Sequence, residues 1–448
     1  MASSRLRVAV IGAGSAGLCS ARHILSRPLS FEPPVVYETT GQVGGTWVYI
    51  GDPVIDAHTH SSMYRDLKTN LPKEIMEFPD FPFDPSLPSF IHHSEVLKYL
   101  EEYTDKFSIR PHIKFNTRVV SVSPVIGDHK PVSWRVIAKN REEEELEKFD
   151  AVMVCVGHYS HPYIPEIEGL KDFQGQVLHS HFYRYPEVFS SRSVVLLGCG
   201  PSGVDIAMEL SSHAERVILS HRGPSLTWTP PGNVSMVPPV VSAASNTLVC
   251  EDGRKIQADT LIFCTGYKYN YPFFVSGAEH GDVLDWGFLE GEDIESPDLG
   301  KGHLPPLYNQ LIHARYPTLG FIGACKIVVP FPLVHCQAQF FLLVLEGKRP
   351  LPPSELMFSE CRQELIKHRA SGLPLKYLYR LGLNQWEYNQ RLADIAGFEP
   401  LAPVLRKLYE VTRDFRGSNP VIYRKINFRI LNREEFEMNM DEMKEAEV

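Results

Sequence analysis

The chain has 448 residues, 43% of them hydrophobic, which is enough for about two to three domains that each bury a core. Its formal charge of −9 arises from 54 acidic and 45 basic residues, and no cluster of Lys and Arg indicates a nucleic-acid-binding surface. Composition therefore excludes a largely disordered chain and argues against nucleic acid as a partner.

Cysteine usage and the first residues indicate a cytoplasmic protein. The eight cysteines include no Cys-x-x-Cys pair and no tight Cys/His group of the zinc type, so we expect buried thiols in a reducing compartment and no metal site. The N-terminus runs directly into an apolar strand, which leaves no room for a signal peptide, and no apolar run reaches the roughly 18–20 residues of a spanning helix. We expect no membrane anchor, and secretion only if a signal peptide has been removed. The sequence leaves open whether the chain forms a homo-oligomer.

The N-terminal part predicts a strand–helix–strand unit followed by a mixed region. A strand at 7–11 precedes a glycine turn, a helix follows to about residue 25, and a strand covers 35–37. Periodicity predicts four further elements, a helix at 94–106 and strands at 113–122, 132–138 and 152–156. We interpret the charged run at 141–147 as a solvated hairpin tip.

A second unit of the same kind follows a proline-rich stretch that begins at Pro162 and is typical of a crossing between domains. Its expected elements are strands at 193–197, 216–219 and 260–264 and a helix at 202–211. After it we expect a strand at 319–322, a helix at 333–345 and a largely helical C-terminal third. The sequence therefore predicts an α/β fold with two Rossmann-like dinucleotide-binding domains, the second inserted at 168–297 into a discontinuous first domain made of 1–167 and 298–448.

The first glycine turn carries a dinucleotide-binding motif, Gly12-x-Gly14-x-x-Gly17. Its glycines permit a tight turn, close approach of a pyrophosphate and close helix packing, and the helix that begins near Ser15 directs its N-terminus at the negative charge. Glu38 ends the next strand, where a carboxylate accepts hydrogen bonds from a ribose diol. A strand, a helix and an acid accompany the motif, so we predict an adenosine site without a 2′-phosphate.

The second turn repeats the motif as Gly198-x-Gly200-x-x-Gly203, with Ser202 inside it. No acid follows its second strand, and the residues there are Ser220-His221-Arg222. A carboxylate would repel a 2′-phosphate, whereas a hydroxyl and a guanidinium bind one. We therefore predict that Ser220 and Arg222 select NADPH over NADH at this second site.

The first nucleotide is expected to be FAD. Hydride exchange between two nicotinamides accomplishes little, whereas a flavin that receives the hydride makes a redox pair. The first site also continues into a glycine-rich segment, which lets backbone pass close to a cofactor and ends in a tryptophan. The candidate residues in it are Gly44, Gly45 and Trp47. A plain flexible loop is the alternative for this segment.

These features together resemble the flavin-containing monooxygenases of class B, which hold both cofactors on one polypeptide. The matching segments are the two glycine motifs, Gly44-Gly45-x-Trp47, residues 63–76, Cys264-Thr265-Gly266-Tyr267, and the run from Phe173 through Gly175 and His179 to Phe182 or Tyr183. The last run resembles the family's identifying pattern. The likeness covers about residues 5–340. The C-terminal part matches more weakly, as in short forms that lack a hydrophobic tail, among which insect alkaloid N-oxygenases are a candidate branch.

The resemblance implies a reaction and roles for several residues. NADPH reduces FAD, O2 forms a C4a-hydroperoxide, and one oxygen atom passes to a nucleophilic nitrogen or sulfur of a small molecule such as an alkaloid or xenobiotic amine or a sulfide. Asn70 matches the family's asparagine near the peroxide, and Thr69, Thr265 and Gly266 are expected to contact a cofactor. We expect Gln337, on the helix after Pro330-Phe331-Pro332, to contact FAD. Without the resemblance, Asn70 reads as a turn asparagine and His179 as a structural histidine.

Three other functions remain open from the sequence. A Baeyer–Villiger monooxygenase uses the same cofactors on a carbonyl, although its identifying pattern typically ends differently. An NADPH oxidase would release H2O2 instead of oxygenating a substrate. A catalytically silent flavoprotein would only sense NADPH, which the intact features of both nucleotide sites disfavour.

Overall fold

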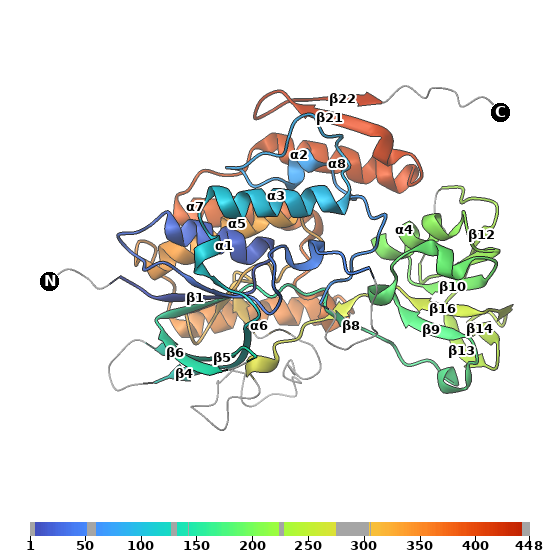
Figure 1. The fold of residues 1–448 in the computed structure, drawn as a ribbon, viewed down its shortest axis with the longest axis horizontal. Coiled ribbons are helices and arrows are strands. Elements are labelled where there is room, and N and C mark those ends of the chain that lie inside the picture. Colours follow the sequence, from blue (N-terminus) through green and yellow to red (C-terminus); the bar gives the residue numbers. More distant parts are fainter. Residues whose placement is uncertain are drawn as a thin grey trace.

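The computed structural model describes residues 5–51, 60–126, 132–141, 143–223, 228–274, 304 and 306–440, and it contains two separate parallel-type sheets (Figure 1). The larger sheet has seven strands. In spatial order they are β18 (Leu307–Tyr308), β19 (Ile312–His313), β20 (Leu319–Phe321), β7 (Ala151–Val154), β1 (Val8–Ile11), β2 (Val35–Tyr37) and β3 (Ile113–Lys114). From β20 to β3 neighbouring strands are parallel, and β18 and β19 form an antiparallel edge.

The larger sheet is built from two distant parts of the chain. Strand β20 pairs in parallel with β7, with Leu319 opposite Val152, and β7 pairs with β1. The chain between β7 and β18 forms the second sheet, so the predicted insertion of one Rossmann-like domain into another is confirmed. The exact domain boundaries stay predictions, and the boundary at residue 297 lies outside the described residues.

Both faces of the larger sheet are covered. Alternate residues of a strand point to opposite faces, and β1 follows this rule. Val8 and Val10 pack into a cluster with the helices, whereas Ala9 and Ile11 pack with Trp134 and the antiparallel sheet on the other face. That sheet consists of β4 (Arg118–Val125), β5 (Ser133–Lys139) and β6 (Glu144–Phe149). Strand β1 is therefore fully buried, as expected for a central parallel strand.

The second sheet has five parallel strands and lies to the right of the first in Figure 1. Its order is β12 (Val234–Val237), β11 (Arg216–Ser220), β10 (Ser193–Leu197), β16 (Thr260–Phe263) and β9 (Gln176–His179). A small antiparallel sheet, β13 (Val240–Ala244), β14 (Thr247–Cys250) and β15 (Lys255–Gln257), accompanies it. The two connections between the domains pair with each other as β8 (His161–Pro162) and β17 (Tyr267–Lys268).

The helices that matter for the candidate site follow the glycine turns or pack against them. They are α1 (Ser15–Leu25), α2 (Lys73–Met76), α3 (His93–Lys106), α4 (Pro201–Leu210), α5 (Pro330–Leu345), α6 (Ser354–Ala370), α7 (Gln385–Ala396) and α8 (Pro403–Ser418). Helix α5 begins three residues before the predicted start, because Pro330 occupies a first-turn position that needs no backbone N–H. Within the described residues no helix is long and apolar enough to span a membrane.

One expectation from the sequence was wrong, and another was incomplete. Most of the charged run at 141–147 is not a hairpin tip but belongs to strand β6, where Glu147 pairs with Arg7 and with Lys114 of β3. Exposed and partly buried residues alternate from Glu144 to Lys148 along this edge strand, and its other side pairs with β5. The C-terminal third contains the helices α5 to α8, as expected, and the sequence analysis did not predict the hairpin of β21 (Ile426–Ile430) and β22 (Phe436–Met440) that follows them.

Candidate functional site

The first glycine turn has a geometry that excludes side chains. Gly12 follows β1 with a φ of +104°, and a Cβ on it would lie 2.7 Å from the carbonyl oxygen of Cys155 at the end of β7. A Cβ on Gly17 would lie 1.8 Å from the Gly12 oxygen. Helix α1 can therefore pack against β1 and β7 only with glycine at these positions, and its N-terminus opens at the carboxyl edge of the sheet.

Glu38 and the segment around Gly45 complete this first cluster. The Glu38 carboxylate, 8% exposed, accepts hydrogen bonds from the backbone N–H groups of Ala13 at 2.9 Å and Thr40 at 2.8 Å. A Cβ on Gly45 would lie 3.0 Å from the Cα of Gly14, so the two glycine segments are in contact. Gly44 has a φ of +117° and precedes the turn that contains Trp47. These predicted residues lie together as expected, with Ser15 at the start of α1.

The second glycine turn repeats the first almost atom for atom. Gly198 has a φ of +112°, and its Cβ would lie 2.6 Å from the carbonyl oxygen of Cys264 at the end of β16. A Cβ on Gly203 would lie 2.0 Å from the Gly198 oxygen. Gly200 is exposed and has no atom within 4 Å of an added Cβ, and Ser202 is exposed on the first turn of α4. A ligand can therefore reach the backbone at this turn.

The residues that follow β11 differ from those that follow β2. Tyr37 and Ser220 stand opposite the last residues of β1 and β10, so His221 occupies the place of Glu38. The Ser220 hydroxyl is buried, donates to the Pro238 oxygen at 3.1 Å and accepts from the Val240 N–H at 3.0 Å. Arg222 is exposed. Of the two expected phosphate ligands, the Ser220 hydroxyl is therefore already hydrogen-bonded to the backbone, whereas the Arg222 guanidinium is accessible.

The run that resembles the family's identifying pattern contacts the segments that connect the two domains. His179 ends β9, is 1% exposed, and its Nε2 lies 3.1 Å from the Gly266 oxygen. Burial, with His181 as a lesser cause, lowers the pKa of His179 to about 4, so the ring is neutral and its Nε2–H donates. The Thr265 hydroxyl donates to the Tyr163 oxygen, and the Tyr163 N–H donates to the Gly266 oxygen at 2.8 Å. These hydrogen bonds hold the two connections between the domains together.

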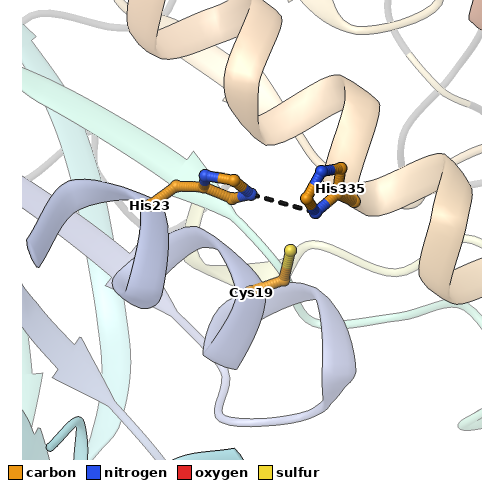
Figure 2. Close-up of side chains that lie close together, drawn as sticks. All are labelled: Cys19, His23 and His335. Carbon is orange, nitrogen blue, oxygen red and sulfur yellow. Dashed lines mark hydrogen bonds between the residues drawn. The ribbon is translucent and has the colours of Figure 1, made fainter. Parts of the chain in front are cut away.

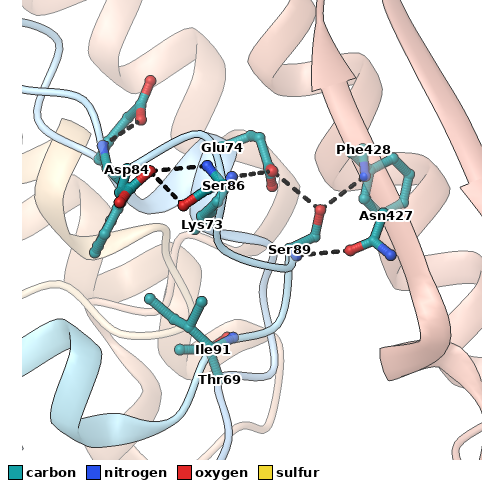
Figure 3. Close-up of polar contacts among 11 residues, drawn as sticks. Thr69, Lys73, Glu74, Asp84, Ser86, Ser89, Ile91, Asn427 and Phe428 are labelled. Carbon is teal, nitrogen blue, oxygen red and sulfur yellow. Dashed lines mark hydrogen bonds and ion pairs between the residues drawn. The ribbon is translucent and has the colours of Figure 1, made fainter.

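The segment with Asn70 is held from several sides. Thr69 is 2% exposed, and its hydroxyl accepts from the Ile91 N–H at 3.2 Å. The Asn70 carbonyl accepts from Arg416 Nη1 of α8 at 3.1 Å. Figure 3 shows how Ser89 then links Glu74, at 3.0 Å, to the backbone of Phe428 in β21, at 2.7 Å. The C-terminal region that the sequence described least well therefore supports this segment.

Contacts between the domains converge on the same segment. Arg424 donates to the Thr69 oxygen at 3.0 Å and to the Lys68 oxygen at 3.2 Å, and it pairs with Asp205 of α4 at 2.5 Å. The Tyr64 hydroxyl donates to the other Asp205 oxygen. Arg424 could not be recognised from the sequence, because a lone arginine in a polar C-terminal stretch carries no local signal of a partner in another domain.

Gln337 has a different environment from the one we expected. It is 0% exposed, its Oε1 accepts from the Gly323 N–H at 2.8 Å, and its Nε2 donates to the Tyr388 hydroxyl at 2.8 Å. Gly323 faces Ala16 of α1, since a Cβ added to Gly323 would lie 3.6 Å from the Ala16 Cβ. Gln337 therefore supports the loop after β20, which lies next to the first glycine turn.

Comparisons with known proteins identify the family. A model described as flavin-binding monooxygenase-like matches residues 5–229. The chain is 34% identical over 449 residues to flavin-containing monooxygenase FMO GS-OX-like 4 of Arabidopsis thaliana, with 93% of each chain covered. The chain belongs to the flavin-containing monooxygenase family. As a family member it is an NADPH-dependent flavin monooxygenase whose cofactors are FAD and NADPH.

Solved structures of flavin monooxygenases share the architecture. The S-allyl-L-cysteine S-oxygenase from Allium sativum has a TM-score of 0.82 at 31% identity, covering 95% of this chain and 96% of that chain. Tmm from Pelagibacter sp. strain HTCC7211 has a TM-score of 0.77 at 27% identity, covering 94% and 93%. The residues of this chain described above fit FAD and NADPH. Its two glycine turns leave backbone accessible, and Glu38, a buried acid of the kind that binds a ribose, lies beside the first turn.

Proposed function

We propose that this flavin monooxygenase transfers one oxygen atom of O2 to a nucleophilic sulfur or nitrogen of a small molecule, with Asn70 at the reaction site. The observation that carries the proposal is the contact of the Lys68–Asn70 segment with helix α4 through Arg424 and Asp205. The contact involves the two residues before Asn70 and supports a position of Asn70 near the junction of the domain expected to bind FAD and the domain expected to bind NADPH.

The first glycine turn is proposed to hold FAD. The N-terminus of α1 would face the pyrophosphate, and Glu38 would accept the ribose hydroxyls while it keeps its hydrogen bond to Ala13. The remaining residues proposed to line this cofactor are Gly12, Gly14, Ser15, Gly17, Gly44, Gly45, Trp47 and Thr69. Gln337 is proposed to act behind this group by supporting Gly323. When bound, the flavin accepts hydride from NADPH and supplies the oxygen-transfer chemistry.

The second glycine turn is proposed to hold NADPH. Gly198, Gly200, Ser202 and Gly203 would present backbone N–H groups and a hydroxyl to the pyrophosphate, and Thr265 and Gly266 would lie at the neighbouring edge of the sheet. Because the Ser220 hydroxyl is already committed to backbone groups, Arg222 is the proposed main ligand of the 2′-phosphate. Ser220 then acts by shaping the loop that leads to Arg222.

Asn70 is proposed to orient the reacting oxygen by hydrogen bonding. An amide both donates and accepts without a titrating proton, so it can hold an oxygen species in place without protonating it. The packing of Thr69 and the hydrogen bond of Arg416 to the Asn70 carbonyl leave the backbone of this segment little freedom. Exclusion of water from the same region would keep NADPH oxidation coupled to oxygenation.

Sulfur is the acceptor that the name of one similar structure suggests. The Allium sativum structure is named as an S-oxygenase of S-allyl-L-cysteine, and it covers nearly the whole of this chain. We therefore propose a thioether as the first substrate class to test and a tertiary amine as the second.

The test uses purified FAD-loaded enzyme with NADPH, 18O2 and a panel of thioethers and tertiary amines. The proposal predicts a sulfoxide or N-oxide that carries one 18O atom, formed in proportion to the NADPH consumed. Stoichiometric H2O2 with no oxygenated product from any panel member would contradict the proposal and favour an NADPH oxidase. Conversion of a ketone to an ester with 18O would instead favour a Baeyer–Villiger activity.

A further inference from the structure

Three potential metal ligands lie close together between α1 and α5, two helices that are far apart in the sequence. Cys19 and His23 are one turn apart on α1, and His335 is on α5. Figure 2 shows the three side chains pointing toward one another between the two helices. Their sulfur and nitrogen ligand atoms all lie within 4.8 Å of one another. Cys19 is 0% and His23 2% exposed, so the group lies inside the protein.

The spacing of these atoms suits a tetrahedral ion. His23 Nε2 lies 3.2 Å from His335 Nδ1. Two nitrogens that each lie about 2.0–2.1 Å from one tetrahedral Zn2+ are about 3.3 Å apart, so the imidazoles already have the required separation. A thiolate and two imidazoles are also the donor types that Zn2+ prefers. The two rings are hydrogen-bonded in the absence of an ion, which gives the group an ordinary alternative state.

Asp80 is the candidate for a fourth ligand, and it approaches the group from the side of His335. Asp80 Oδ1 is buried, makes no hydrogen bond within the described part of the chain, and lies 3.9 Å from His335 Nδ1. The His335 and Asp80 side chains are 12% and 23% exposed, which gives an ion access from the surface. Asp80 Oδ2 pairs with Arg22, whereas Oδ1 is left to accept an ion on the side of His335.

We propose that Cys19, His23 and His335 form a binding site for Zn2+, with Asp80 as the fourth ligand. The ion would join α1, whose N-terminus forms the first glycine turn, to α5, which supports the loop at Gly323. It would have a structural role, because all four coordination positions are filled by the protein and none is left for a substrate.

Arg22 opposes this ligation and offers an independent test. Its Nη1 lies 3.2 Å from His23 Nδ1, and its Nη2 pairs with Asp80 Oδ2 at 2.5 Å. When Nε2 of His23 binds the ion, the ring proton resides on Nδ1 and meets a second donor. Arg22 also competes for Asp80. Replacing Arg22 by Met is therefore expected to strengthen zinc binding by roughly tenfold, which is the scale on which outer-shell residues alter metal affinity.

The experiment measures Zn2+ alone on the FAD-loaded enzyme. The protein is stripped with a chelator, given one equivalent of Zn2+ and gel-filtered, and zinc and FAD are quantified separately, while competition with a fluorescent chelator gives the Kd. We expect one bound Zn2+ per chain. Cys19→Ala and His335→Ala should each weaken binding by more than roughly 100-fold, because even outer-shell changes are worth about 10–100-fold.

Cys336→Ala is the matched control, since Cys336 is a buried thiol of α5 outside the group, and it should bind zinc as the wild type does. Cobalt in place of zinc should give thiolate-dependent absorption that Cys19→Ala abolishes. The proposal is overturned if the wild type retains no stoichiometric zinc, or if Cys19→Ala and His335→Ala bind it as well as the wild type. Zinc content is read separately from oxygenation, so either hypothesis can fail without the other.

Discussion

Arg424 of the C-terminal region forms an ion pair with Asp205 of α4, with 2.5 Å between guanidinium and carboxylate. The pair joins the two nucleotide domains, and the side chains are 24% and 19% exposed. The same guanidinium donates to the backbone of Lys68 and Thr69. Arg424 is therefore a positioning residue that relates the Asn70 segment to the helix of the second domain.

Arg424→Met should remove the ion pair with Asp205 and the two hydrogen bonds to the backbone together. Asp205 would keep the hydrogen bond that the Tyr64 hydroxyl donates to its other oxygen. We expect a loss of about 2 kcal/mol of unfolding free energy and a rise in H2O2 released per NADPH, because the domains no longer hold the segment rigidly. Arg424→Lys should restore the charge without the forked hydrogen bonding, and so recover stability more than coupling.

The matched control for Arg424 is Arg406→Met, which breaks the exposed ion pair with Glu387. The Arg406 and Glu387 side chains are 45% and 60% exposed, so the expected change in unfolding free energy is below about 1 kcal/mol. The H2O2 released per NADPH should not change. Equal effects of Arg424→Met and Arg406→Met on H2O2 release would contradict the positioning role. Thermal unfolding and peroxide assays on the same preparations measure both quantities.

Asn70→Ala should uncouple the enzyme without unfolding it. The main contacts of this segment use the backbone of Asn70 and the side chain of Thr69, which the substitution leaves in place. We expect NADPH oxidation to continue while product per NADPH falls by about tenfold or more, since a hydrogen bond at the reacting oxygen is lost. Lys68→Ala is the control, because it removes an exposed side chain of the same segment and keeps the backbone oxygen that Arg424 contacts. Unchanged product yield in Asn70→Ala would exclude a role at the reacting oxygen.

Glu38→Gln should weaken FAD binding. The carboxylate accepts from the backbone N–H groups of Ala13 and Thr40, and an amide nitrogen in place of one oxygen would face one of these donors. We expect a roughly tenfold or larger rise in the FAD Kd, measured by fluorescence titration of the apoprotein. Glu215→Gln, an exposed site in the second domain, should leave the Kd unchanged. Full FAD retention by Glu38→Gln would remove this residue from the proposed site.

Arg222→Ala should reduce the preference for NADPH over NADH. An exposed guanidinium that binds a phosphate contributes a charge-assisted hydrogen bond, so we expect kcat/KM for NADPH to fall roughly tenfold or more while that for NADH stays nearly constant. Arg254→Ala removes another partly exposed arginine of the same domain and serves as the control. A fall for both nucleotides in equal proportion would assign the 2′-phosphate to other residues.

Glu209 of α4 should make stability depend on pH. Burial raises the pKa of its carboxyl from an ordinary 4.5 to about 7, and the Tyr183 hydroxyl donates to it at 2.7 Å. Because the pKa of the folded state is the higher one, the stabilising contribution is complete below the unfolded pKa and is lost as pH rises through about 7.

Glu209→Gln removes this titration but keeps an acceptor for Tyr183. The melting temperature of Glu209→Gln should therefore rise relative to that of the wild type as the pH increases from about 5 to about 8. A difference in Tm that stays constant over this range would show that Glu209 does not titrate there. Glu215→Gln, which changes an exposed carboxylate, should show no such trend.

Local patterns in the sequence were sufficient for much of the fold. The two glycine motifs, the acid at Glu38 and the flanking apolar strands act over short stretches, and their geometry depends on neighbouring residues. Gly12 and Gly198 therefore have nearly the same φ, +104° and +112°, in two domains, as the repeated motif predicts. The β6 strand was missed because a nearly continuous run of charged residues is typical of a loop when the pairing partner is not known.

The sequence by itself determined the order of the elements, the two nucleotide-binding turns and the absence of an acid after the second, because these are written in residues close together along the chain. Only the tertiary structure decided which distant side chains meet. Arg424 reaches Asp205, and His335 reaches His23 at 3.2 Å, because packing of whole helices and domains sets those separations. The spacing of residues within one helix does not predict which side chains of another helix they will meet. The group of Cys19, His23 and His335 could therefore be recognised only from the packing of α1 against α5.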